Sequence, residues 1–544
     1  MGGSKKLIIL FLLFVFTSEG IAQVDRYVVY FRDKLNSPFL IEEPQAYLSP
    51  KAIERRERQN ISINEEDLPV NPQYVSGVKD LATNIFHKSK WFNAVLIEAS
   101  EAQVESIFQL PYVEKVEYVA PGSLPARRAG GTSRPLANRN NKRSSNTSAF
   151  QNQLLGVDIM HEAGFKGEGM LIGIFDGGFL NADVLPFFEH IFNSDKIKFT
   201  YDYVRNEPIV YAHNRHGTEV FSNIGAFQVG ELEGTAYNAD FILSITEDDV
   251  TEYRVEEYNW IFAAEAADSV GVDIINSSLG YNTFNDPFMN YTYEDVNGET
   301  AVISRASVIA AEKGIFLVSS AGNEGNKAWR YLTAPADAFG TLAVGAVNSN
   351  LEVASFSSVG PTADGRIKPD VVALGTSVVV GKIDGSIGLN NGTSFASPLV
   401  AGLVAGIWQA NRELTVPQLL EKVRSSGTNF ETPNNQIGYG IPNFVRAQNN
   451  IILSVNENLL QAFKIFPNPV IAGELFITSE KTYNNNNFNV KIHASNGMLI
   501  LDRNMTFSHN SEPVALNIND LPPGLYGVTI TSNKLSEKVK IIKN

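Results

Sequence analysis

The feature that most constrains the fold of this chain is an alternation of short apolar segments with helical ones between residue 149 and about residue 450. Short apolar strands separated by helices are typical of a buried parallel sheet covered by helices on both faces. The sequence therefore predicts an α/β domain. Strands are expected at 170–175, 241–245, 272–276 and 315–320, and helices at 260–270 and 303–313.

Two smaller units flank the α/β domain. Residues 24 to about 120 contain expected strands at 26–31, 93–98 and 113–119 and a helix at 100–109, which predicts a small α+β module. Beyond about residue 450, short strands alternate with turns rich in Asn, Gly and Pro. That pattern predicts an antiparallel β-sandwich of about 80 residues.

The N-terminus carries the pattern of a signal peptide. Lys5 and Lys6 precede an apolar run at 7–16, and Gly20-Ile21-Ala22 supplies small residues for cleavage after Ala22. The alternative is a membrane anchor, but this apolar run is too short, because a bilayer-spanning helix needs about 20 residues. We therefore expect export through the inner membrane and no transmembrane segment.

A basic segment rich in Gly, Ser and Asn joins the first unit to the α/β domain. Its six cationic residues are Arg127, Arg128, Arg134, Arg139, Lys142 and Arg143. Exposed linkers of this kind attract proteolytic nicking, although a plain solvated hinge is the alternative. The expected division is a signal peptide at 1–22, an N-terminal unit at 23–122, a linker at 123–148, the α/β domain at 149–450, a linker at 451–462 and a C-terminal unit at 463–544.

Composition excludes several classes of function. The net charge of −15 argues against broad nucleic-acid binding. The chain contains no cysteine, so it has neither disulfide bonds nor thiol chemistry.

A serine lies at the expected start of an apolar helix. Ser394 belongs to Asn391-Gly392-Thr393-Ser394-Phe395-Ala396-Ser397-Pro398, which precedes a run of small and apolar residues at 399–410. A helix start offers free N–H groups and a positive dipole end, which favour developing negative charge. Pro398 is expected in the first turn, which places the start near Ser394. The alternative is a capping serine on a core helix.

Nucleophilic catalysis by serine needs a base and an acid that orients the base. His216 precedes Gly217, which permits tight packing, and Asp176 ends an expected strand. Asn323, in a Gly-rich segment after another strand, could donate to an oxyanion together with the Ser394 N–H. Taken singly, the Asp and the His are more often structural, and the Asn is more often a turn former.

These motifs together resemble the subtilisin-like serine endopeptidases, or subtilases. The resemblance is carried by the segments 173–178, 216–218, 276–280, 320–324 and 392–398, in the family's order of Asp, His and Ser. It implies a catalytic triad of Asp176, His216 and Ser394, with Asn323 in the oxyanion hole. It also implies substrate binding by main-chain pairing, with Ser278, Leu279, Gly280, Ala321 and Gly322 at the binding site. The chain departs from the family pattern at Gly177 and Phe395.

The flanking units carry resemblances of their own. Residues 23–122 resemble subtilase propeptides, which implies a folding aid and inhibitor that is cut away near the basic linker. The C-terminal unit is similar to the sorting domain of the type IX secretion system of Gram-negative bacteria, through the segments 466–469, 521–526 and 538–543. Its alternative is a generic β-sandwich appendage that binds a surface.

The sequence thus predicts an exported serine endopeptidase made as a zymogen, either secreted or attached to the cell surface. Its expected partners are polypeptide substrates, its own propeptide and the type IX secretion machinery. A catalytically inactive peptide-binding surface protein is the alternative, and a peptidase confined to maturing co-exported proteins is another. The chemistry requires no cofactor; structural Ca²⁺ is possible from the resemblance, but no segment has convincing ligand spacing.

Overall fold

The computed structural model describes residues 23–122, 147–449 and, with short gaps, 463–543. The expected signal peptide, nearly all of the basic linker and the linker at 451–462 lie outside the described residues. The chain divides into two compact units, 1–451 and 452–544.

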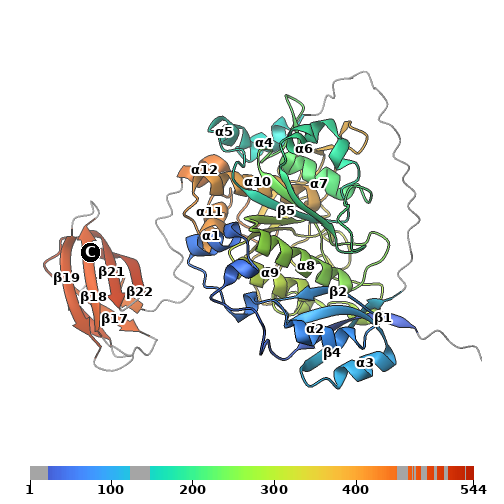
Figure 1. Cartoon of the computed structure of the whole chain (residues 1–544). Coiled ribbons are helices and arrows are strands. Elements are labelled where there is room, and N and C mark those ends of the chain that lie inside the picture. Colours follow the sequence, from blue (N-terminus) through green and yellow to red (C-terminus); the bar gives the residue numbers. More distant parts are fainter. Residues whose placement is uncertain are drawn as a thin grey trace, which may run out of the picture. The chain divides into compact units, whose positions relative to one another are not determined.

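The larger of these two units, which holds both the N-terminal module and the α/β domain, is built on a seven-stranded sheet. The order of its strands is β13-β12-β11-β10-β5-β9-β6 (Figure 1). Every neighbouring pair in this sheet is parallel. Its strands are β5 (Leu171–Asp176), β6 (Ile197–Asp202), β9 (Asp240–Ile245), β10 (Ile274–Ser277), β11 (Phe316–Ser320), β12 (Thr341–Val347) and β13 (Val371–Leu374). The predicted α/β fold class is confirmed.

Helices cover both faces of this sheet. Side chains of α7 (His216–Gly225) and α10 (Thr393–Ala410) pack in one apolar cluster with Ile172 and Ile174 of β5. Side chains of α8 (Val255–Val270) and α9 (Val302–Glu312) pack in another cluster with Leu171 and Phe175 of the same strand. Successive residues of a strand point to opposite faces, which is why β5 reads as a continuous apolar run. Smaller helices are α4 (Ala149–Leu154), α5 (Val157–Glu162), α6 (Glu189–Asn193), α11 (Val416–Ser425) and α12 (Phe444–Asn449).

The N-terminal residues form an antiparallel sheet with the order β2-β3-β1-β4. Its elements are β1 (Val24–Phe31), β2 (Asn84–Ser89), β3 (Ala94–Ser100), β4 (Val113–Pro121), α1 (Pro50–Gln59), α2 (Pro72–Lys79) and α3 (Glu101–Phe108). The predicted α+β character is confirmed. The elements α1, α2 and β2 add to the strands and helix expected from the sequence.

This N-terminal sheet packs on α8 and α9, beside which it lies in Figure 1. Buried charges accompany the apolar contact. Asp268 of α8 is fully buried and lies 2.7 Å from Nζ of Lys90, 2.5 Å from Nη2 of Arg55 and 2.9 Å from Nη2 of Arg56. Nearby on α8, the carboxylate of Glu265 accepts hydrogen bonds from the turn at 89–91.

The second unit consists of two antiparallel sheets, β16-β17-β20 and β19-β18-β21-β22. One apolar core holds side chains of both sheets, among them Leu475 and Val528. The strands are β16 (Phe463–Phe466), β17 (Glu474–Ser479), β18 (Asn487–Ala494), β19 (Leu499–Thr506), β20 (Val514–Asn517), β21 (Gly524–Ser532) and β22 (Leu535–Lys543). The predicted small β-sandwich is confirmed.

Candidate active site

Ser394 is the second residue of α10, and it is only 7% exposed. The helix starts near the expected residue, but Pro398 is its sixth residue and therefore lies beyond the first turn. A proline has no N–H to offer the carbonyl four residues earlier, which here is that of Ser394. The hydroxyl of Ser278 donates to that carbonyl instead, at 2.9 Å. The prediction of the helix start was right, but the reason given for it was wrong.

Asp176 and His216 meet at the carboxyl edge of the sheet. Asp176 ends β5 and is fully buried, while His216 begins α7. Nδ1 of His216 lies 2.8 Å and 3.0 Å from the two carboxylate oxygens of Asp176. A Cβ on Gly217 would lie 2.4 Å from the carbonyl oxygen of Gly178, so this close approach of α7 requires glycine.

Two opposing effects act on the pKa of His216. Burial opposes protonation of His216, but the Asp176 carboxylate outweighs it and raises the pKa of His216 to about 9. With Nδ1 bound to Asp176, the other ring nitrogen is available to a partner. The imidazole side chain is 33% exposed, which leaves it open to the pocket described below.

Asn323 is oriented by the start of α10. Its Oδ1 accepts hydrogen bonds from the N–H of Thr393 at 2.9 Å and from the Thr393 hydroxyl at 3.0 Å. Because the carboxamide oxygen is used in this way, the Nδ2 donor faces elsewhere. An amide donor held in advance is what stabilisation of an oxyanion requires.

A pocket of about 600 Å³ brings most of the predicted site residues together. Its lining includes six of them, namely His216, Ser278, Leu279, Gly280, Asn323 and Ser394. Asp176 lies behind the pocket, bonded to His216. The hydroxyl of Ser394 donates to the carbonyl of Ser278 at 3.3 Å in this structure.

Two predicted substrate-binding residues do not line this pocket. The side chain of Ala321 belongs to a buried apolar cluster, and its N–H donates to Val344 O within the sheet. Gly322 has a φ of +103°, and its carbonyl accepts a hydrogen bond from Ser358 N. Both residues position Asn323, which follows them directly.

Sequence reasoning missed an acidic wall of the same pocket. The loop after β9 contributes Glu247, Asp248, Asp249 and Glu252 to the lining. Burial, with the nearby Asp176 carboxylate, raises the pKa of Glu247 to about 7. A run of acidic residues directly after a predicted buried strand was the available signal, since ligands bind at that edge.

The segment 281–300 reaches the pocket through Asn285. Its Oδ1 accepts from the N–H of Glu252, and its own N–H donates to the carbonyl of Glu252. Tyr291 instead bonds the buried carboxylate of Glu257. The segment therefore supports the acidic loop.

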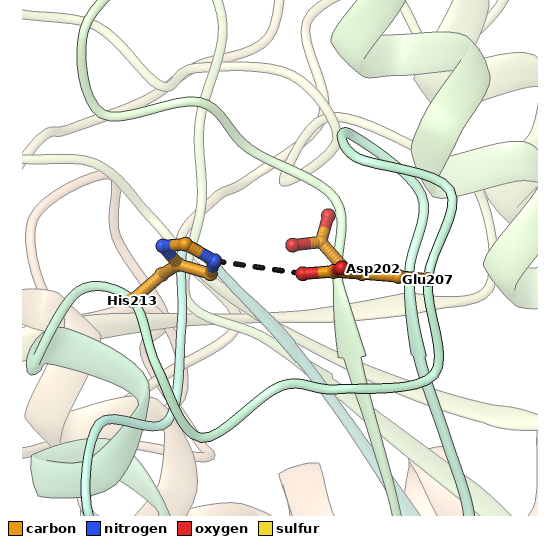
Figure 2. A group of neighbouring side chains, drawn as sticks. All are labelled: Asp202, Glu207 and His213. Carbon is orange, nitrogen blue, oxygen red and sulfur yellow. Dashed lines mark ion pairs between the residues drawn. The ribbon is translucent and has the colours of Figure 1, made fainter. Parts of the chain in front are cut away.

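Away from this pocket, Asp202, Glu207 and His213 form a group of side chains with the spacing of metal ligands (Figure 2). His213 Nε2 lies 3.7 Å from Glu207 Oε1. The Asp202 carboxylate, however, already accepts hydrogen bonds from Val204 N, Arg205 N and Arg205 Nη1. These hydrogen bonds hold the loop at 202–205 in place and account for the burial of Asp202 without a metal ion.

No helix among the described residues is long and apolar enough to cross a bilayer.

Three family models match separate parts of the chain. Residues 167–440 match the model of the subtilase family, residues 26–134 that of the Peptidase S8 propeptide domain of Bacteroidota, and residues 464–544 that of the secretion system C-terminal sorting domain. The resemblances stated from the motifs are thereby confirmed.

Similar curated proteins come from several organisms. Subtilisin-like protease SBT6.1 of Arabidopsis thaliana is 29% identical over 46% of this chain and 22% of its own length. Membrane-bound transcription factor site-1 protease of Homo sapiens is 26% identical over 50% of this chain and 24% of its own length. Subtilisin E of Bacillus subtilis (strain 168) is 30% identical over 49% of this chain and 63% of its own length. The chain spans less than a quarter of the length of the first two proteins. The subtilase family model, however, covers half of the chain. The chain therefore belongs to the subtilase family.

Proposed function

We propose that this chain is an exported serine endopeptidase that is made as a zymogen and hydrolyses peptide bonds through an acyl-enzyme. The observation that carries the proposal is the Asp176–His216 pair, which adjoins a pocket also lined by Ser394 and Asn323. These side chains supply every role that the reaction needs, without a cofactor.

The proposed sequence of steps begins with attack of the Ser394 hydroxyl on the substrate carbonyl carbon. His216 takes the hydroxyl proton and passes it to the leaving amine, while Asp176 orients the ring and stabilises the imidazolium. Nδ2 of Asn323 and the N–H of Ser394 stabilise the tetrahedral oxyanion. Water then attacks the acyl-enzyme, with His216 as base again, and frees Ser394.

The segment Ser278-Leu279-Gly280 is proposed to bind the extended substrate backbone. It lines the pocket directly after β10, so a peptide could pair with it as an added strand. A Cβ on Gly280 would lie 2.1 Å from Thr333 Oγ1, which explains the glycine in this segment.

The N-terminal unit is proposed to inhibit the enzyme until cleavage in the zone 123–148. The match to a sorting domain supports secretion or attachment at the cell surface by the type IX machinery. Export by a signal peptide at 1–22 belongs to the same proposal.

The nucleophile is tested by Ser394→Ala. This variant is expected to lose peptide hydrolysis by at least about 10⁴-fold, because no other group can form the acyl-enzyme. It should also accumulate as the uncut chain, which intact mass and N-terminal sequencing of the secreted protein would reveal. A fluorophosphonate probe should label the native protein at Ser394. Undiminished hydrolysis by the variant would refute the proposal, and an unlabelled native protein would favour an inactive peptide-binding protein.

A further inference from the structure

The acidic loop beside the proposed catalytic groups has an excess of negative charge. Glu247, Asp248, Asp249 and Glu252 line the pocket, and no lysine or arginine is among its lining residues. The carboxylate of Asp248 is bonded within its own loop, by Val250 N and Thr251 Oγ1, each at 3.2 Å. The ligand-binding capacity of this wall therefore lies in its glutamates.

Glu256, in the first turn of α8, is buried behind Glu247 and Glu252 and does not itself line the pocket. Carboxylate oxygens of Glu247, Glu252 and Glu256 all lie within 4.8 Å of one another. Glu256 is 1% exposed, and its Oε1 accepts a hydrogen bond from Tyr253 N at 3.3 Å. Its Oε2 is buried without any donor among the described residues. A buried carboxylate oxygen without a partner is costly, so the geometry calls for a cationic donor from outside.

The electrostatics agree with the geometry. Burial, with the neighbouring carboxylates of Glu247 and Glu257, raises the pKa of Glu252 to about 8. Burial, together with Glu252 and Glu247, also holds the pKa of Glu256 well above its usual range. The three groups therefore resist ionising together unless a positive charge joins them.

The position of the acidic wall next to Ser394 indicates which kind of cation it would bind. The acidic wall and Ser394 share one pocket, so a peptide positioned for cleavage would place a side chain against Glu247 and Glu252, with Glu256 next to both. An ammonium or guanidinium group on a long apolar stem can reach a buried carboxylate while its backbone stays at the rim.

We propose that Glu247, Glu252 and Glu256 recognise a lysine or arginine side chain of the peptide substrate. The inference rests on the proposed peptidase function and adds its substrate class, peptides with a basic residue near the cut bond. The chain itself contains such a peptide, because the zone 123–148 carries six basic residues and no Asp or Glu. Self-processing and recognition of other substrates would then use the same carboxylates.

The test uses quenched fluorescent peptides and the purified full chain after any self-processing. Arginine is placed in turn at each position around the cut bond and compared with citrulline, which has nearly the same shape and no charge. The expected result is a kcat/KM at least about tenfold higher for arginine at one position, since a charge-assisted hydrogen bond is lost with citrulline. Equal rates at every position would overturn the inference, whereas hydrolysis of neither peptide would overturn the proposed function instead.

Two variants test whether the preference for arginine depends on these glutamates. Glu252→Gln with Glu256→Gln is expected to lower the arginine-to-citrulline ratio at least about fivefold, while exposed Glu299→Gln is the matched control and leaves it unchanged. Glu252→Lys should abolish the preference for arginine, because the added ammonium group would pair with Glu247 and Glu256. Thermal melting of each variant verifies that it is folded. An unchanged ratio in folded variants would overturn the inference.

A divalent cation is the competing occupant. Ca²⁺ titration by calorimetry is therefore run on the native chain and on Glu256→Gln. Tight Ca²⁺ binding that this substitution abolishes, together with equal rates for arginine and citrulline peptides, would identify a metal site and overturn the inference. A preference for arginine that persists in the presence of a chelator supports it.

Discussion

At the scale of single residues, the proposed mechanism makes the working pH depend on the charge of His216. The imidazole must be neutral to accept a proton from Ser394. Although burial lowers its pKa, Asp176 raises it to about 9, and Glu247 contributes in the same direction. We expect kcat/KM for an uncharged peptide to be low near pH 7 and to rise as the pH approaches 9. A pH–rate profile of the native enzyme measures this limb.

Glu247→Gln removes one of the negative charges that favour the imidazolium. The pKa of His216 should fall, so the rising limb of the profile is expected at lower pH than in the native enzyme. The same profile is recorded for Glu299→Gln, an exposed control. A limb that stays in place or moves to higher pH would contradict this account of the His216 environment.

The sequence could identify the groups proposed for chemistry better than those proposed for recognition. Asp176, His216, Asn323 and Ser394 lie in short motifs whose residue types are demanded by the reaction, and the structure gathers them at one edge. The acidic wall escaped notice because short acidic runs usually lie in solvated loops. Nothing local to the sequence reveals that Glu256, within an acidic first turn of a helix, is buried.

At the scale of elements, α10 depends on a hydroxyl from the segment that follows β10. Ser278 Oγ donates a hydrogen bond to the Ser394 carbonyl, because Pro398 has no N–H that could do so. Ser278→Ala is expected to cost about 1 kcal/mol of the free energy of unfolding. The cost should be smaller in a Pro398→Ala background, because an alanine at this position would supply the missing N–H. A double-mutant cycle by chemical denaturation measures the coupling, and strictly additive effects would contradict it.

The strands show where sequence patterns succeed and where they fail. Those at 171–176, 240–245 and 316–320 were predicted within one residue, because buried parallel strands form continuous apolar runs. The edge strand β6 escaped prediction, since Ile197–Asp202 mixes apolar and polar residues. The four-residue strand β13 also escaped prediction. The start of α8 was placed late, because Glu256 and Glu257 resemble a solvated turn.

At the scale of the whole molecule, the N-terminal unit is held to α8 by buried ions. Arg55, Arg56 and Lys90 hold the pKa of Asp268 well below its usual range, in spite of its burial. Asp268→Asn leaves these cations without their shared carboxylate and is expected to cost about 3–5 kcal/mol. Secreted yield and the melting temperature of the full chain measure the loss. Exposed Asp195→Asn is the control, and equal stability of the two variants would contradict the role of Asp268.

If the N-terminal unit is cut away as proposed, the ion pairs between α1 and the α/β domain have a further consequence. Lys51, Arg55 and Arg58 all face carboxylates of the larger partner, either Asp268 or Asp273. Opposite charges draw two bodies together before they touch, and dissolved salt weakens that pull. Added sodium chloride should therefore slow recapture of the severed segment much more than it speeds its escape.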